Sequence, residues 1–218
     1  MPNEILLFIS LVASYSLMLA AYKLFGKMGL FVWIPICTIL ANIEVTVLVN
    51  AFGMEQTLGN TLFASSYLAT DILSERHGEK DASKAVWVGI FTSVVFIGFS
   101  FLWRLYTPSE NDWAFESIKT LFSNTPRMLT ASLLGYAVSE LLDVKLYHAW
   151  WKFTEKKCGN RERFLWVRNN FSTLVSQFVN IVIFNFGAFL GLPGYDIKTL
   201  ISITGACYLI YVFTSILD

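Results

Sequence analysis

The sequence predicts an all-α integral membrane protein, a compact bundle of about seven transmembrane helices. Of its 218 residues, 55% are hydrophobic and only 15% are charged, more apolar than the core of a soluble domain of this length requires. Four runs contain no Asp, Glu, Lys or Arg, and each is close to or above the roughly 20 residues with which a helix crosses a bilayer. These runs are residues 5–22, 85–103, 169–195 and 199–217.

Three further segments are apolar but interrupted by polar side chains, and we expect them to be helices as well. The interruptions are Asn42 and Glu44 in residues 28–50, Asn60 and Asp71 in residues 57–74, and Glu140, Asp143 and Lys145 in residues 127–151. The expected helices cover residues 4–24, 28–50, 57–74, 85–106, 127–151, 165–190 and 198–217. No soluble domain interrupts them, so a single polytopic membrane domain is expected over residues 1–218.

The first helix is expected to remain as a membrane anchor rather than to be removed as a signal peptide. The segment before it has no basic residue and carries Glu4 instead. Its apolar stretch is longer than the apolar core of a signal peptide, and no clear cleavage signal follows.

Lysine and arginine predict the orientation, because they are enriched in cytoplasmic loops. They concentrate after the first, third and fifth expected helices: Lys23 and Lys27, then Arg76, Lys80 and Lys84, then Lys152, Lys156, Lys157, Arg161, Arg163 and Arg168. The amino terminus is therefore expected outside and the carboxyl terminus in the cytoplasm. We expect residues 152–168 to form a solvated basic loop, with contact to anionic lipids as the alternative.

The long external connection, residues 107–126, allows two interpretations. It could form a short interfacial helix over the entrance to the bundle. Its Trp113 and Phe115 could equally be ordinary anchors at the level of the lipid headgroups, where aromatic residues gather.

Composition and motifs exclude several other classes of protein. Three isolated cysteines, Cys37, Cys158 and Cys207, form neither a disulfide framework nor a metal or redox motif. A net charge of zero argues against a nucleic-acid surface. No familiar catalytic or nucleotide-binding motif is present. We therefore expect no enzyme, cofactor or metal site, and we expect membrane lipids as partners, with a homodimer left open.

The fifth and sixth expected helices share the pattern Ser-[Glu/Gln]-x-x-[Asp/Asn]. In the fifth it is Ser139, Glu140 and Asp143, with Tyr136 one turn earlier, and in the sixth it is Ser176, Gln177 and Asn180, with Thr173 one turn earlier. The i, i+3 spacing places the polar side chains on one face of each helix. Both patterns fall near the middle of their spans, so antiparallel neighbours would present them to each other, where carriers hold their substrates.

The alternative is that these groups only bind one another as polar contacts between helices. That alternative is weaker for Glu140 and Asp143, because a buried carboxyl needs a cation, a proton or a ligand donor. Lys145 could pair with one of them. Asn42, Glu44, Asn60 and Asp71 could complete the pocket. For Asp71 and Glu75, a salt-bridged helix end beside the basic loop is an equal alternative.

A set of motifs in fixed order gives a resemblance to a known family. The motifs are Ala41 to Glu44, Phe52-Gly53, Thr57 to Asn60, Leu68 to Glu75 with Gly78, Ala131 to Asp143, and Arg168 to Asn170 leading into Ser172 to Gln177. From about residue 41 to the end, the chain resembles the VUT (YhhQ-type) family of queuosine precursor transporters. It departs from that family at His77, Glu140 and Asn180, where an aromatic residue, glutamine and aspartate are usual.

The resemblance implies import of 7-deazaguanine bases for tRNA modification, across the inner membrane of a prokaryotic cell. The substrates would be 7-cyano-7-deazaguanine, 7-aminomethyl-7-deazaguanine or queuine. Glu140 or Asp143 would accept the adjacent N–H and amino group of a guanine-like edge. Gln177 and Asn180 would be their partners, and Tyr136 or a nearby Phe would be a stacking face. The alternative is a substrate-binding subunit that docks on a separate energising module, as in energy-coupling-factor transporters.

Overall fold

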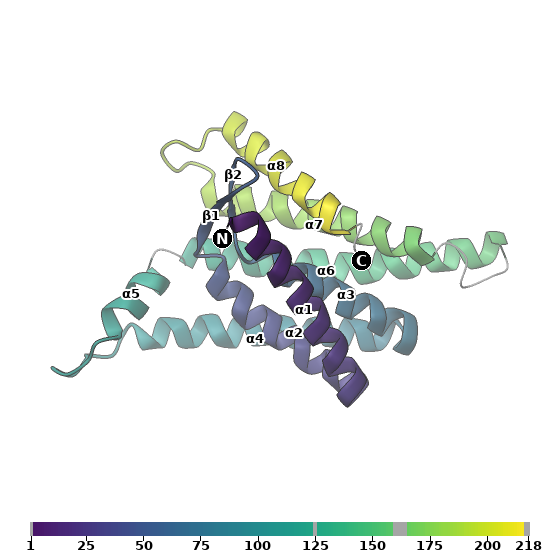
Figure 1. Cartoon of the computed structure of the whole chain (residues 1–218), viewed down its shortest axis with the longest axis horizontal. Helices are drawn as coiled ribbons and strands as arrows, with labels where there is room; N and C mark the ends of the chain where they lie inside the picture. Colours follow the sequence, from purple (N-terminus) through teal and green to yellow (C-terminus); the bar gives the residue numbers. More distant parts are fainter. Residues whose placement is uncertain (1, 124–125, 159–164, 216–218) are drawn as a thin grey trace.

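The computed structural model describes residues 2–123, 126–158 and 165–215. These residues form eight helices and one two-stranded hairpin (Figure 1). In chain order the elements are α1 (Asn3–Phe25), α2 (Lys27–Glu44), β1 (Leu48–Ala51), β2 (Met54–Thr57), α3 (Asn60–His77), α4 (Glu79–Trp103), α5 (Phe115–Ser123), α6 (Pro126–Cys158), α7 (Leu165–Phe189) and α8 (Ile197–Ser215).

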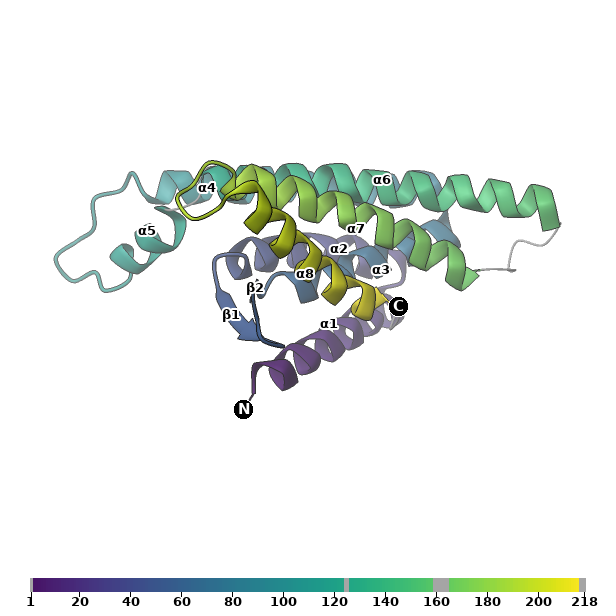
Figure 2. The ribbon, with the colours of Figure 1, turned by 90° about the horizontal axis from the view of Figure 1, so that it is seen from above.

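The helices form two packed groups that meet in one bundle. Helices α6 and α7 run side by side and share the most extensive interface of the described residues, and α8 packs on α7 (Figures 1 and 2). Helices α2, α3 and α4 pack against one another, and α1 covers α2 and α3. Contacts of α3 and α4 with α6 join the groups. Figure 2 shows α6 and α1 on opposite faces, with α2 and α3 between them.

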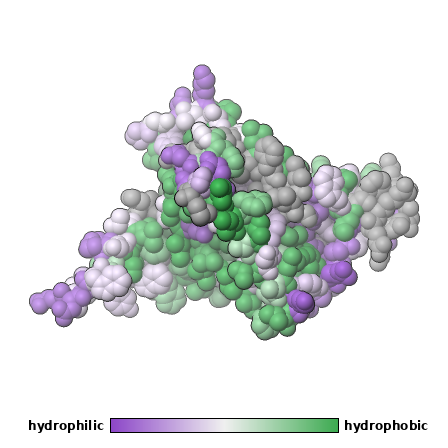
Figure 3. Space-filling model, in the orientation of Figure 1, coloured by the Kyte–Doolittle hydropathy of each residue, from purple (hydrophilic) through white to green (hydrophobic). Residues whose placement is uncertain are grey.

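The surface and the helix lengths are those of a multi-pass membrane protein. Helices α1, α2, α4 and α7 are long and apolar enough to cross a bilayer, by length and composition. Large apolar side chains such as Phe8 and Phe91 are 58% and 69% exposed. In Figure 3, hydrophobic residues cover the centre of the visible face, and hydrophilic residues gather toward its ends. That α3, α6 and α8 also cross the membrane stays a prediction.

The expectation of a helix over residues 28–50 is wrong beyond Glu44. Helix α2 ends there, and β1 pairs antiparallel with β2 from Leu48↔Thr57 to Ala51↔Met54. Phe52 and Gly53 form the two-residue turn with φ of 56° and 72°, the positive values of a type I′ hairpin turn. The preceding run Val45-Thr46-Val47 is rich in β-branched residues, which favour strands over helices.

Tight junctions and side-chain caps set the other helix boundaries. Gly26 and Gly78, with φ of 57° and 88°, join α1 to α2 and α3 to α4 within one residue, a conformation that glycine adopts without strain. Helix α4 therefore begins at Glu79, earlier than the expected residue 85, and α6 extends beyond residue 151 to Cys158.

The external connection contains a short helix, α5, as one of the two interpretations allowed, and its place at the membrane interface stays a prediction. The Asp112 carboxylate accepts hydrogen bonds from the backbone N–H groups of Ala114 and Phe115, at 3.0 and 2.6 Å, and caps it. Asp196 caps α8 in the same way through the Thr199 N–H, at 2.8 Å. Hydrogen bonds from the Thr199 side chain and backbone hold the pKa of Asp196 below its usual range.

The basic connections lie at one end of the bundle, where their lysines form ion pairs. We call this the basic end. Lys27, the first residue of α2, lies 2.9 Å from Asp81 of α4. Lys152 of α6 lies 3.9 Å from Glu79 at the start of α4. At the other end, the Arg127 guanidinium of α6 donates to the Gly187 carbonyl of α7 at 2.7 Å. This sorting agrees with the charge pattern, and the side of the membrane stays a prediction.

Candidate functional site

The polar faces of α6 and α7 meet, as the shared pattern predicts. Glu140, Asp143 and Ser176 are all 0% exposed. The Ser176 hydroxyl donates to Asp143 Oδ1 at 2.9 Å. The Asn180 amide packs against Gly135, where an added Cβ would come within 2.4 Å of its Oδ1. The glycine therefore allows the two helices to approach closely at this level.

Helix α3 provides the third wall of the site. Ser66 Oγ donates to Glu140 Oε1 at 2.8 Å, and Thr70 Oγ1 donates to Glu140 Oε2 at 3.3 Å. The Tyr67 hydroxyl donates to Ser139 Oγ at 2.7 Å. Sequence reasoning missed these α3 residues, although Ser66 and Thr70 stand at i, i+4 on one helix face. We call Ser66, Thr70, Ser139, Glu140, Asp143, Ser176 and Gln177 the polar layer.

Gln177 is the member of the polar layer whose side chain is left without a partner. It is 1% exposed, and neither its Oε1 nor its Nε2 has a hydrogen-bond partner among the described residues. Leaving a buried polar group unsatisfied costs about 1 to 3 kcal/mol. The amide offers one acceptor and two donors at the level of the buried carboxylates.

Asp71 and Glu75 join α3 to its neighbours α6 and α7. Asp71 Oδ2 accepts a long hydrogen bond of 3.5 Å from Thr173 Oγ1. The Glu75 carboxylate accepts from the Tyr147 hydroxyl at 2.7 Å and pairs with Arg168. The expected salt bridge at this helix end therefore exists, but its described cation is on α7 and not in the neighbouring loop.

The expectation that Arg168 lies in a solvated loop is wrong. It lies in the first turns of α7 and is 0% exposed. Its guanidinium carbon is 4.8 Å from the ring centre of Tyr147 and 4.4 Å from that of Trp151, within cation–π range. We call Glu75, Tyr147, Trp151 and Arg168 the arginine cluster.

The remaining predicted residues lie at the edge of this site or apart from it. Tyr136 is buried, with its hydroxyl against Gly89 of α4 and its ring 5.8 Å from that of Phe63. Asn42 donates to the Thr38 carbonyl of its own helix and to Ser93 of α4, at 2.7 and 3.4 Å.

Glu44 and Lys145 do not join the polar layer in the described structure, and Asn60 is not tested by it. Glu44 ends α2 and is half-buried, and its Oε2 has no hydrogen-bond partner among the described residues. The Asn60 side chain lies outside the described part of the structure. Lys145 is exposed, whereas Glu140 and Asp143 are fully buried.

Residues 57–218, more than half of the chain, match the family described as "Putative vitamin uptake transporter". The chain belongs to this family. The matched region contains α3, α6 and α7, and with them the whole polar layer and the whole arginine cluster.

Two curated relatives carry the same description, "Probable queuosine precursor transporter". The one from Bacillus subtilis is 39% identical over 185 residues, which are 84% of this chain and 78% of the relative. The one from Haemophilus influenzae is 28% identical over 108 residues, 47% of this chain and 45% of the relative. No solved structure is significantly similar to the chain.

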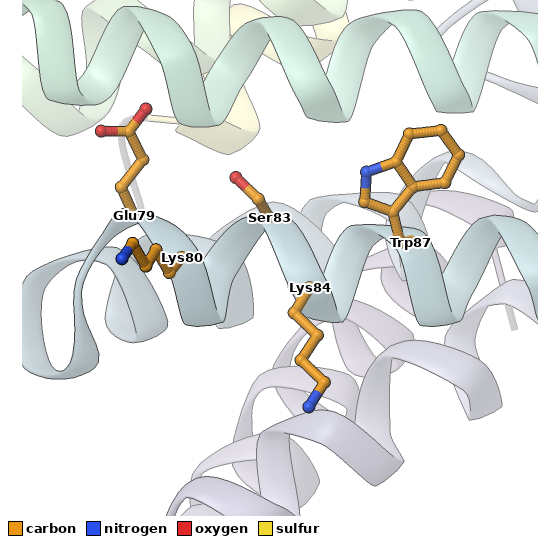
Figure 4. A pocket seen from close by; sticks show the side chains of 5 residues that line it. All are labelled: Glu79, Lys80, Ser83, Lys84 and Trp87. Atoms are coloured by element: carbon orange, nitrogen blue, oxygen red, sulfur yellow. The ribbon is translucent and has the colours of Figure 1, made fainter.

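A surface pocket of this family member lies away from the polar layer, at the basic end of α4. It has a volume of about 590 Å³ and is lined by Glu79, Lys80, Ser83, Lys84 and Trp87. Figure 4 shows Glu79 and Ser83 on one side of α4 and Lys84 pointing to the other. Lysine and tryptophan side chains are typical of the membrane–water interface.

The chemistry of the polar layer is that of recognition. It combines two carboxylates, three hydroxyls that already orient them, and one amide with free hydrogen-bonding capacity. A carboxylate has about four lone-pair positions, so the two hydroxyls on Glu140 leave it further capacity. Such a set suits the polar edge of a small planar ligand.

Proposed function

We propose that this transporter imports queuosine precursors, 7-deazaguanine bases such as 7-cyano-7-deazaguanine, 7-aminomethyl-7-deazaguanine or queuine, for tRNA modification. The support is its family together with the description of the Bacillus subtilis relative, which is 39% identical over most of this chain. The membrane is the inner membrane of a prokaryotic cell, and the substrate passes through the bundle of α3, α6 and α7.

The observation that carries the proposal is the buried amide of Gln177, next in the chain to Ser176, whose hydroxyl donates to the buried Asp143 carboxylate. A guanine-like base presents a carbonyl oxygen, a ring N–H and an amino group along one edge. Glu140 or Asp143 would accept from the ring N–H and the amino group as a bidentate pair. The Gln177 Nε2 would donate to the carbonyl, so a ligand would satisfy an amide that no described residue satisfies.

The other predicted residues have supporting roles in this proposal. Ser139 and Ser176 orient their neighbours, and Asn180 lines the adjoining turn of α7. Tyr136 and Phe63 offer an aromatic pair on which the base could stack, which is worth about 1 to 3 kcal/mol per base. Asn42, Glu44, Asn60 and Asp71 remain candidates for the outer part of the pocket.

Ligand-induced thermal stabilisation of the detergent-purified protein tests the substrate. The panel is 7-cyano-7-deazaguanine, 7-aminomethyl-7-deazaguanine, queuine and guanine. A ligand that binds only the folded protein raises its stability by about 2.7 kcal/mol at 100 times its dissociation constant. We expect a larger shift with at least one precursor than with guanine, which presents the same edge but has no 7-substituent. No shift with any precursor would contradict the proposal.

A matched pair of variants on α7 tests the assignment of Gln177. Gln177→Leu should abolish the ligand-induced shift, because the base carbonyl would lose its donor. Asn185→Leu is the control, since the Asn185 amide is buried on the same helix but donates to Thr204 Oγ1 at 3.1 Å. An unchanged shift in Gln177→Leu would remove this residue from the site.

Uptake by the purified protein alone in proteoliposomes separates a self-sufficient carrier from a substrate-binding subunit. A carrier of the alternating-access type should accumulate or exchange the bound precursor without another protein. Binding without uptake would instead favour a subunit that requires a separate energising module.

A further inference from the structure

Helices α3, α6 and α7 are joined at two levels along the bundle. The first level is the polar layer, in which α3 and α7 each contact α6. The second level is the arginine cluster, with Glu75 from α3, Tyr147 and Trp151 from α6, and Arg168 from α7. From Glu140 to Tyr147 the chain advances seven residues, so the levels are about 10 Å apart along α6.

The arginine cluster lies between the polar layer and the basic end. Along α6, Lys152 comes directly after Trp151 and pairs with Glu79 at that end. The Arg168 side chain is 0% exposed, whereas the Glu75 side chain it contacts is 25% exposed. The cluster therefore lies between the buried polar layer and the surface of the basic end.

The contacts of Arg168 fill the space where the three helices converge. Its guanidinium lies over the rings of both Tyr147 and Trp151 and bonds Glu75. The Tyr147 hydroxyl donates to the same Glu75 oxygen, Oε2, at 2.7 Å. Trp151 is in turn stacked on His148, with 5.7 Å between ring centres and 12° between planes. A ligand moving from the polar layer toward the basic end along these helices meets this group of rings and charges.

A charged pair suits a contact that must open and close. Apolar side chains of similar volume often stabilise a closed helix interface as well as a buried ion pair does. Charges differ because water can satisfy them after they separate, so both the joined and the separated states are accessible. The ion pair is thus better explained by an interface that opens than by a permanent one.

We propose that Arg168 is a gating residue, whose ion pair with Glu75, held by Tyr147 and Trp151, closes the route between the polar layer and the basic end. This structure is the state closed at that end, and passage of substrate requires the pair to separate. The inference rests on the proposed transport function, but its first test needs no substrate.

The test measures access to a cysteine placed just behind the cluster. Ser172 is fully buried one turn after Arg168, and its hydroxyl donates only to the Asn169 carbonyl among the hydrogen bonds described. Ser172→Cys is made in a background in which Cys37, Cys158 and Cys207 are replaced by alanine. Its reaction with a membrane-impermeant maleimide is timed in vesicles of both orientations.

Opening the cluster should expose this cysteine from one side only. The double variant Glu75→Gln/Arg168→Gln removes both charges together, so neither is left buried alone. We expect labelling from the basic end to accelerate by about fivefold or more, as the open state gains population. Lys152→Met is the control, because it removes the exposed pair with Glu79 at the same end and should label like the parent.

A second readout separates gating from a structural role. The double variant should bind 7-cyano-7-deazaguanine within about threefold of the parent affinity and lose about tenfold in uptake, because only opening and closing is changed. If the double variant does not fold, Tyr147→Phe removes only the hydroxyl bond to Glu75 and should accelerate labelling by about twofold.

An unchanged labelling rate in a folded double variant, or in Tyr147→Phe when the double variant does not fold, would overturn the gate. Equal acceleration from both sides would overturn it too, because that indicates general loosening. If the parent protein binds no precursor, the proposed substrate fails, and the labelling result still decides whether Arg168 is a gate.

Discussion

The two groups of helices in this bundle pack by different chemistry. Helices α1, α2 and α4, together with one side of α3, meet through fully buried apolar residues such as Leu30, Ile34 and Val86. The interface of α3, α6 and α7 contains the polar layer and the arginine cluster. The same chain therefore builds one apolar interface and one polar interface around helix α3.

This difference supports the proposed division between a structural interface and a ligand-binding interface. Within a bilayer, apolar helices gain little from leaving the lipid, so close packing holds them together. Buried carboxyls, and an amide without a partner among the described residues, reduce stability and are retained where they bind or move something. We therefore expect the apolar interface to determine stability and the polar interface to serve the proposed ligand recognition.

The largest effect is expected from Ile34→Ala in the apolar interface. Ile34 is fully buried, and the cavity should lower the free energy of unfolding by about 2 to 5 kcal/mol. Denaturant unfolding in detergent measures it, with the half-exposed Ile36 on the same helix as the control site. Ligand affinity should stay unchanged, and a changed affinity would break the division of roles.

Neutralising the carboxyls of the polar layer should reduce binding rather than folding. Asp143→Asn and Glu140→Gln should each weaken precursor binding by about tenfold or more, since a hydrogen bond to a charged group contributes about 1.5 to 3 kcal/mol. Isothermal titration measures the affinity, and Asp81→Asn, which affects only the Lys27 pair at the basic end, is the control. If both variants retain affinity and uptake, the carboxyls are not the site.

Gln177→Leu should stabilise the folded protein while it abolishes binding. Removing a buried amide without a described partner relieves a desolvation cost of about 1 to 3 kcal/mol. Asn185→Leu should have the opposite sign, because it leaves Thr204 without its donor. Thermal unfolding of both variants without ligand measures the difference, and a destabilised Gln177→Leu would show that the amide is already satisfied.

The smallest effect is expected outside both interfaces. Lys119 pairs with Glu116 on α5 at 3.4 Å, and their side chains are 50% and 76% exposed. Lys119→Ala should change stability by at most about 0.5 kcal/mol, because exposed pairs contribute little. A larger shift of the unfolding temperature would indicate that α5 packs on the bundle more firmly than its exposure implies.

The pairing of α6 with α7 could be predicted from the sequence, and the role of α3 could not. Ser139 to Asp143 and Ser176 to Asn180 repeat one spacing at one depth, which is enough to place two antiparallel faces together. Ser66 and Thr70 carry only hydroxyls, which occur often in transmembrane helices for packing alone. Their contact with Glu140 joins residues 74 and 70 positions apart, and no local pattern encodes it.

Two expectations are wrong because they rest on local composition and not on the residues that each segment contacts in the fold. Arg168 follows a run of basic residues, so charge density suggested a loop, but its partner Glu75 is 93 positions away. The segment after Glu44 is as apolar as the helix before it, so hydrophobicity predicts a continuous helix. Its β-branched residues and Phe52-Gly53 instead favour strands and a tight turn. Both cases show that hydrophobicity alone does not fix where a membrane helix ends.

The length of helix α6 makes the protein sensitive to the thickness of the membrane. With 33 residues it is about 50 Å long, whereas α2, with 18 residues, is about 27 Å long. If α6 spans the membrane as predicted, a hydrocarbon core of about 30 Å leaves it ample excess length and leaves α2 none. Longer lipid chains would therefore strain the α2 side first and shift it along the membrane normal relative to α6. The rate of transport should thus depend on the acyl-chain length of the lipids, because a thicker bilayer would move the two sides of the bundle relative to each other.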